Sequence, residues 1–95
     1  MIERQHLEII DLLRREGTLA RVAEELHLMQ PTITHAIRKL EGELGVPLWR
    51  PRGRGVELTQ AGDVLARRSA RILADLRRTE SDLMAIADTG GALEA

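Results

Sequence analysis

The sequence predicts a mainly α-helical fold that carries one small β-hairpin. Trp49 is the only aromatic residue, so the core has to be built from Leu, Ile, Val and Ala, a composition that favours helices over a β-sandwich. Glycine and proline residues divide the chain into three short segments and one long segment with apolar residues at helical spacing. The 95 residues suffice for one small domain without cysteine, which we expect to gain stability by association.

The first two helices are predicted at 3–16 and from Thr18 to about His27. Gly17 separates them, in the position of a C-cap glycine, and Thr18 is a suitable N-cap for the second helix. The apolar residues of both helices recur at helical spacing: Leu7, Ile10, Leu13, Leu19, Val22, Ala23 and Leu26.

A third helix is predicted from Gln30 or Pro31 up to Gly45, because proline is tolerated in the first turn of a helix and glycine ends one. A turn at 27–29 joins it to the second helix. Two short helices joined by a tight turn, the second of which begins with polar residues, are typical of a helix-turn-helix. The third helix has one narrow apolar stripe, formed by Ile33, Ile37, Leu40 and Leu44.

The segment 46–58 is predicted to be a β-hairpin, because it holds two prolines and two glycines. Its strands are expected at 48–50 and 56–58, on either side of a basic tip. A helix-turn-helix followed by such a hairpin is a winged helix-turn-helix, in which the hairpin is the wing.

Thr59 is the predicted N-cap of a long helix over 60–88, roughly 40 Å in length. Its large apolar residues follow a period of 3.5, which is typical of a helix that packs along a second helix. We therefore expect it to form a homodimer, with Ser69 and Thr79 at the two polar positions of the seam. The apolar positions of the predicted dimer interface are Leu65, Ile72, Leu76, Leu83 and Ile86.

The arginines of the long helix are expected to form a solvated flank that pairs with Asp75, Glu80 and Asp82. The predicted organisation is a winged helix-turn-helix domain at 1–58, a linker and dimerisation helix at 59–88 and a flexible tail at 89–95. The glycine pair in this tail suggests that the chain was excised from a longer protein.

The net charge of −1 is unevenly distributed along the chain. Residues 35–78 contain ten Lys or Arg against five acids, whereas 1–34 contain four bases against six acids and 79–95 contain four acids and no base. A protein of nearly neutral overall charge can bind DNA when its bases share a face. The charge distribution therefore favours a nucleic-acid partner.

The third predicted helix has a polar and basic face opposite its apolar stripe. No carboxylate lies near the N-terminal end of this face, unlike an ordinary solvated helix surface. Small side chains allow a close approach, while hydroxyl, amide, imidazole and guanidinium groups can donate to phosphates and base edges. The candidate DNA-binding residues here are Gln30, Pro31, Thr32, Thr34, His35 and Arg38.

Arg50, Arg52 and Arg54 are the second set of candidate DNA contacts. Their alternation would place them on one side of an extended ribbon, where they suit a phosphate or minor-groove contact. The alternative is an edge hairpin whose charges protect it from aggregation. Trp49 is expected to fill the space under the hairpin, because one aromatic residue cannot form the stacking surface of a single-strand binder.

Other classes of function find little support. The three histidines have no metal-ligand spacing and no cofactor is expected; tyrosine, cysteine and a glycine-rich phosphate loop are absent, so we predict no enzyme. No charge-free stretch approaches about 18 residues, and the N-terminus lacks a secretion signal. These features predict a cytoplasmic protein without a membrane segment.

An ordered series of motifs covers nearly the whole chain: Gly17-Thr18-Leu19, Ala23, Leu26, Gln30-Pro31, Ile33-Thr34, Ile37-Arg38-Lys39-Leu40-Glu41, Leu44-Gly45-Val46-Pro47-Leu48-Trp49 and Leu58-Thr59-Gln60-Ala61-Gly62. In this series the chain resembles the N-terminal domain of the LysR-type bacterial transcription regulators. The resemblance implies a winged domain whose third helix enters the major groove and whose wing touches the flanking minor groove. It also implies an antiparallel dimer of linker helices and a separate effector-binding domain, which this chain lacks.

The chain departs from the usual pattern of that family at four positions. Met29 stands where Ser or Thr usually caps the third helix, so we expect that helix to lack a side-chain cap. His35 and Ala36 stand in place of Arg and Gln, and Pro51 stands in place of an arginine of the wing. The departures leave the expected fold intact, but individual base contacts do not transfer from the family.

The sequence thus predicts a homodimer that binds double-stranded DNA sequence-specifically, as the promoter-binding part of a bacterial transcription regulator. A two-fold dimer favours an interrupted palindrome as its site. The alternative is a helical dimerisation module that binds proteins and not DNA. The carboxylate-free third helix and the arginine-rich wing favour DNA.

Overall fold

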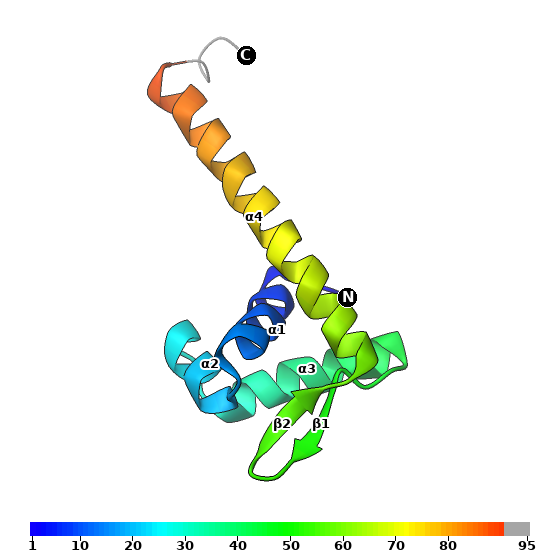
Figure 1. Cartoon of the computed structure of the whole chain (residues 1–95). Coiled ribbons are helices and arrows are strands. Elements are labelled where there is room, and N and C mark those ends of the chain that lie inside the picture. The colour runs from blue at the N-terminus through cyan, green and yellow to red at the C-terminus, as the bar shows by residue number, and fades with distance from the viewer. Residues whose placement is uncertain (91–95) are drawn as a thin grey trace.

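The computed structural model describes residues 1–90 and confirms the mainly helical winged helix-turn-helix fold. Figure 1 shows three short helices gathered at one end of a long helix, with a hairpin beside them. The molecule is elongated, with extents of 55 × 27 × 20 Å. Residues 91–95 of the predicted tail lie outside the described residues. The elements are α1 (Arg4–Glu16), α2 (Leu19–Leu26), α3 (Gln30–Leu44), β1 (Trp49–Arg52), β2 (Gly55–Leu58) and α4 (Gln60–Asp88).

The helix ends lie close to the predicted positions. Gly17 ends α1 at φ 84° and Gly45 ends α3 at φ 75°, in the left-handed region that glycine adopts without steric cost. Thr18 caps α2, and its Oγ1 accepts a hydrogen bond of 3.2 Å from the backbone N–H of Arg21. His27 ends α2 at φ 55° without being glycine, and this left-handed residue makes the tight turn towards α3.

One apolar core joins the three short helices to the hairpin and to α4. Ile9 and Ile10 of α1, Val22 of α2 and Leu48 beside β1 are almost completely buried. Trp49 packs against this core from the hairpin, so its predicted place beneath the wing is confirmed. The α3 contribution is the predicted stripe, of which Ile33, Ile37 and Leu40 are fully buried and Leu44 is half-buried.

The first half of α4 packs on the core of its own chain, chiefly against α1. Ala66, Ser69 and Leu73 are buried there, and Leu65 packs against the core cluster. The prediction that these seam positions face a second helix is therefore wrong for Ser69, which its own chain buries completely, while Leu65 is partly covered by its own chain. Two members of the buried stripe are small residues, which is why a count of large apolar side chains did not reveal it.

Two contacts fix the hairpin relative to the helices on either side. The Glu41 Oε2 atom in α3 accepts a hydrogen bond of 2.7 Å from the backbone N–H of Leu48. On the other side, Thr59 Oγ1 donates to the Pro47 carbonyl (2.7 Å) and accepts from the backbone N–H of Gly62 (3.1 Å). A methyl group on Gly62 would come within 1.8 Å of the Leu48 carbonyl oxygen. Glycine at this position therefore allows the first turn of α4 to lie against the backbone at Leu48.

Candidate DNA-binding surface

The α3 face opposite the core forms the first part of the candidate surface. The apolar stripe of α3 is turned inward, so the predicted polar face is open to solvent, and the first acid of the helix is Glu41. The carboxylate-free head of α3 is thus present in the structure. Of the candidate residues, Thr34 is half-buried, while the others are exposed: Gln30, Pro31, Thr32, His35 and Arg38.

The first turn of α3 begins without a side-chain cap, as expected from Met29. The Met29 carbonyl accepts hydrogen bonds from the backbone N–H groups of Thr32 (3.0 Å) and Ile33 (3.3 Å), but its side chain accepts none. The first turn of α3 contains no acidic residue. No carboxylate in the first turn of α3 therefore offsets the positive end of the helix dipole, which favours an approaching phosphate.

The hairpin is a two-stranded antiparallel ribbon in which Arg50 lies opposite Glu57. The Arg50 Nε atom lies 3.5 Å from Glu57 Oε1, and the Arg52 Nη1 atom lies 2.7 Å from Glu57 Oε2. Arg50 and Arg52 therefore share one side of the ribbon, as predicted. The same expectation is wrong for Arg54, which lies in the turn after Gly53, because strand alternation ends at Arg52.

Glu57 is a partner of the wing arginines that the sequence pattern did not reveal. It contacts both strand arginines and so lowers the positive charge of the unbound wing. A two-residue turn at 53–54 would have indicated this pairing, because it places Arg50 opposite Glu57. All three arginines are exposed, and exposed ion pairs are weak. Arg50 and Arg52 can therefore exchange Glu57 for a phosphate, while Arg54 forms no ion pair within residues 1–90.

The wing tip, the start of α2 and the start of α3 meet around one hollow of about 360 Å³. Gln30 of α3 and Arg54 of the wing both line it, and Thr18, the N-cap of α2, borders it as well. Gln30 of the first candidate set and Arg54 of the second, which were predicted separately from the sequence, therefore border the same hollow. Arg50 and Arg52, which pair with Glu57, do not line it.

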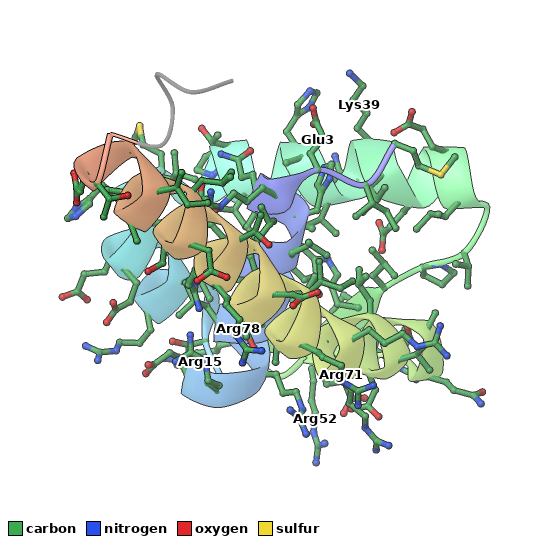
Figure 2. All side chains as sticks on the ribbon, turned by 90° about the horizontal axis from the view of Figure 1, so that it is seen from above. Glu3, Arg15, Lys39, Arg52, Arg71 and Arg78 are labelled. Atoms are coloured by element: carbon green, nitrogen blue, oxygen red, sulfur yellow. The ribbon has the colours of Figure 1, made fainter. Side chains whose placement is uncertain are left out.

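The ten bases of 35–78 do not all lie on this surface. Five belong to α3 and the wing, and five belong to α4. Figure 2 shows Lys39 of α3 on the same side as Glu3, with which it lines a second hollow, whereas Arg52 of the wing lies on the opposite side with Arg71 and Arg78 of α4. Only part of the predicted basic surface is therefore available to one DNA duplex.

The ion pairs of α4 differ from those predicted. Arg67 Nη2 lies 2.8 Å from Asp63 Oδ2 within α4. Glu80 Oε2 lies 3.0 Å from Arg4 Nη1 at the start of α1, so the predicted pairing of Glu80 with the α4 arginines is wrong. The reason is that α1 packs along α4 and brings a base from the other end of the chain to Glu80.

A second exposed surface lies on α4 and continues onto the domain. Ile72, Leu83 and Ile86 are 46%, 61% and 51% exposed, and Leu76 is half-buried. Met84, which was not predicted, is also exposed. An apolar groove of about 490 Å³ adjoins Ile72. Its apolar lining is Ile2, Leu7, Leu44, Val46, Leu48, Ala61, Val64, Leu65 and Ile72.

We searched the part of the chain that the structure describes for metal-binding clusters and for membrane-spanning helices. Across residues 1–90, no three or more His, Asp or Glu side chains gather closely enough to hold a metal ion. Within the same range, no helix combines the length and the apolar character needed to span a bilayer.

The fold, the open α3 head and the basic wing define a winged helix-turn-helix DNA-binding domain. A family model described as "Bacterial regulatory helix-turn-helix protein, lysR family" matches residues 4–63. The chain therefore belongs to the LysR family of transcriptional regulators, as a DNA-binding domain and not an enzyme.

The relatives agree with this assignment. The chain is 36% identical to the HTH-type transcriptional regulator PcaQ of Agrobacterium fabrum over 77 residues, which is 81% of this chain and 25% of that protein. It is 37% identical to the RuBisCO operon transcriptional regulator of Allochromatium vinosum over 79 residues, 83% of this chain and 26% of that protein. The chain thus spans about a quarter of the length of the curated relatives it matches.

Solved DNA complexes share the fold over most of the chain. The CbnR DNA-binding domain in complex with DNA has a TM-score of 0.80 and 35% identity, covering 90% of this chain and 99% of that one. The BenM DNA-binding domain in complex with catB site 1 DNA has a TM-score of 0.82 and 27% identity, covering 90% and 96%.

Proposed function

We propose that this chain binds specific promoter sequences as a homodimer and places two copies of α3 in successive major-groove faces. The observation that carries the proposal is the junction of a carboxylate-free α3 head with an arginine of the wing tip around one hollow. An ordinary solvated helix would not combine an uncompensated N-terminus with a neighbouring free guanidinium. A major-groove helix flanked by a backbone-binding wing requires this combination.

The two parts of the surface have different proposed roles. Gln30, Thr34, His35 and Arg38 carry groups that can donate to base edges, and Pro31 and Thr32 allow the helix to approach closely. Arg50, Arg52 and Arg54 bind the phosphates or the minor groove beside the half-site. Affinity then depends on both parts, whereas preference for a sequence depends on α3.

The proposed dimer forms through α4, whose exposed apolar side chains would otherwise remain in water. The charge of α4 supports an antiparallel pair. Residues 60–78 hold five arginines against two acids, whereas 79–90 hold three acids and no base. An antiparallel pair places each basic half beside an acidic half, and a parallel pair would oppose like charges.

The groove beside Ile72 supports the same arrangement. In an antiparallel pair centred near Leu76, Leu83 and Ile86 of one copy lie over 66–69 of the other, next to Leu65 and the groove. The apolar end of one α4 would thus cover the apolar groove of the other copy. Leu65, although packed in its own chain, then remains at the edge of the interface.

The relatives suggest the larger setting of this domain. Their names are those of transcriptional regulators, and the chain corresponds to about a quarter of their length. We infer that the domain acts at a bacterial promoter together with an effector-binding domain, in the cytoplasm where the DNA is.

The test is selection of bound sites from random duplex DNA with the 95-residue chain. We expect enrichment of an interrupted palindrome whose half-sites lie about one helical turn, or a multiple of it, apart. Enrichment of a single half-site would contradict the dimer and leave DNA recognition standing. Recovery of unrelated sequences would contradict sequence-specific binding itself.

A further inference from the structure

Met29 exposes an apolar side chain at the start of α3. Its exposed fraction is 74%, the highest among the large apolar side chains that the structure describes. The other exposed large apolar residues of the described chain lie at the N-terminus, on the loop after α3 or on α4. Met29 therefore stands alone on the helix-turn-helix.

The structure of the chain itself gives this side chain no role. It is not a member of the apolar core, where the preceding Leu28 packs instead. It occupies the N-cap of α3, but the backbone carbonyl makes the capping hydrogen bonds, and the side chain makes none. Polar side chains stabilise this position and methionine does not. No contact within residues 1–90 therefore accounts for a methionine at this position.

The location of Met29 indicates the ligand. It directly precedes Gln30, which lines the hollow shared with Arg54, and α3 begins there. A thioether cannot donate a hydrogen bond to a phosphate. Along the base edges of the major groove, the apolar group is the C5-methyl of thymine. Methionine is flexible and polarizable, so it can adjust to such a small apolar partner.

We propose that Met29 contacts the 5-methyl group of a thymine in each half-site and makes binding depend on that methyl group. The inference rests on the proposed entry of α3 into the major groove. It adds an apolar specificity contact to the hydrogen-bonding residues of α3.

The experiment replaces each thymine of the selected site, in turn, with deoxyuridine, which lacks only the methyl group. Dissociation constants are measured for the unchanged chain and for two variants, Met29→Ser and Met29→Leu. Ser is a preferred N-cap residue, so Met29→Ser should fold at least as stably as the unchanged chain. Leu keeps an apolar side chain of similar volume and serves as the matched control.

For the unchanged chain, we expect deoxyuridine to weaken binding about four-fold when it replaces one particular thymine in either half-site, the value for one buried methyl group. Met29→Leu should retain most of this penalty. Met29→Ser should bind the thymine site more weakly and show no penalty for deoxyuridine at that position.

Four results would overturn the inference. If no thymine shows a methyl-dependent penalty, or if the penalty is the same with Met29→Ser, Met29 does not contact the methyl group, although sequence-specific binding stands. If the chain selects no sequence at all, the proposed function fails first and the methyl contact fails with it. A loss of dimerisation in Met29→Ser without any change in the deoxyuridine pattern would assign Met29 to a protein contact.

Discussion

Arg38 is the exposed base of α3 that follows Thr34 and His35 by one helical turn. At the scale of single residues, the question is whether such a base recognises sequence or only charge. A guanidinium that binds a guanine edge discriminates between sequences, whereas one that binds a phosphate does not. Exposure alone is the same in both cases, so a comparison of two DNA sequences is needed.

We expect Arg38→Ala to cost about 1–3 kcal/mol on the selected site and much less on random DNA. Fluorescence anisotropy with both duplexes measures the difference. Lys39→Ala is the matched control, because Lys39 lies on the edge of α3 beside Glu3 (Figure 2), and it should weaken both complexes equally. Equal losses for Arg38→Ala would make Arg38 a phosphate contact.

Gly62 shows a different residue-scale effect, on stability. We expect Gly62→Ala to destabilise the domain by about 1–3 kcal/mol through overpacking, although alanine favours a helix by about 1 kcal/mol. The cause is the 1.8 Å approach of the added methyl group to the Leu48 carbonyl oxygen. Urea denaturation measures the change.

Gly42→Ala is the control for this prediction. Gly42 lies inside α3 with nothing within 4 Å of an added methyl group, so alanine there should stabilise the domain by up to about 1 kcal/mol. If Gly62→Ala stabilises the domain as well, the close approach between Gly62 and the Leu48 carbonyl oxygen does not require glycine at the start of α4.

At the scale of elements, the hairpin combines two kinds of arginine. Arg50 and Arg52 share Glu57, whereas Arg54 extends from the turn towards the hollow that Gln30 also lines. The register of the two strands decides this difference. The wing should therefore attract DNA less strongly than three unpaired arginines would. The reason is that Arg50 and Arg52 first have to exchange the Glu57 carboxylate for a phosphate.

We expect the double variant Arg52→Ala, Arg54→Ala to flatten the dependence of log Kobs on log salt concentration. Two lost phosphate contacts in each copy correspond to a slope change of at most about 1.8 per copy, or about 3.6 for the dimer, and the competition of Glu57 for Arg52 should reduce it. Titrations at several salt concentrations measure the slope, and circular dichroism should show an unchanged fold. Arg78→Ala, in the second half of α4, should leave the slope unchanged. An unaltered slope in the double variant would exclude the wing from the DNA contacts.

At the scale of the whole molecule, α4 has two functions along its length. Its first half completes the core through Ala66, Ser69 and Leu73, and its second half extends beyond the rest of the chain with apolar residues exposed (Figure 1). The ion pair between Arg4 and Glu80 ties the start of the second half of α4 to α1. A dimer through α4 would therefore hold the two α3 helices at a set separation.

We expect Ile72→Asp to shift the chain towards the monomer and to weaken binding to the two-half-site duplex far more than to a single half-site. The reason is that pairing would bury the new carboxylate without a partner, while the 46% exposure of Ile72 leaves the monomer intact. Sedimentation equilibrium gives the oligomeric state. Ala74→Asp adds the same charge to an exposed position on the opposite face of α4 and should remain dimeric. An unchanged chain that stays monomeric at high concentration would contradict the dimer and the palindrome together.

The local features of this protein followed from the sequence alone. Gly17, Gly45, Thr18 and Thr59 marked the helix ends, because caps depend on the conformation of one residue and its near neighbours. The buried stripe of α3 and its carboxylate-free opposite face followed from helical periodicity. Met29 at the start of α3 also predicted a missing cap. For these features, the relevant contacts lie within a few residues of each other.

The tertiary structure decided what depends on contacts between distant parts of the chain. Ala66 and Ser69 are too small to signal a buried face, and only the packing of α1 along α4 shows that they are covered. The same packing forms the ion pair between Glu80 and Arg4 and places Leu65 against the core of its own chain. The pairing of the two strands places Glu57 against Arg50 and Arg52. The position of the turn keeps Arg54 away from this ion pair. Periodicity shows that a helix face is apolar, but the surface that covers this face is determined by where the other elements pack.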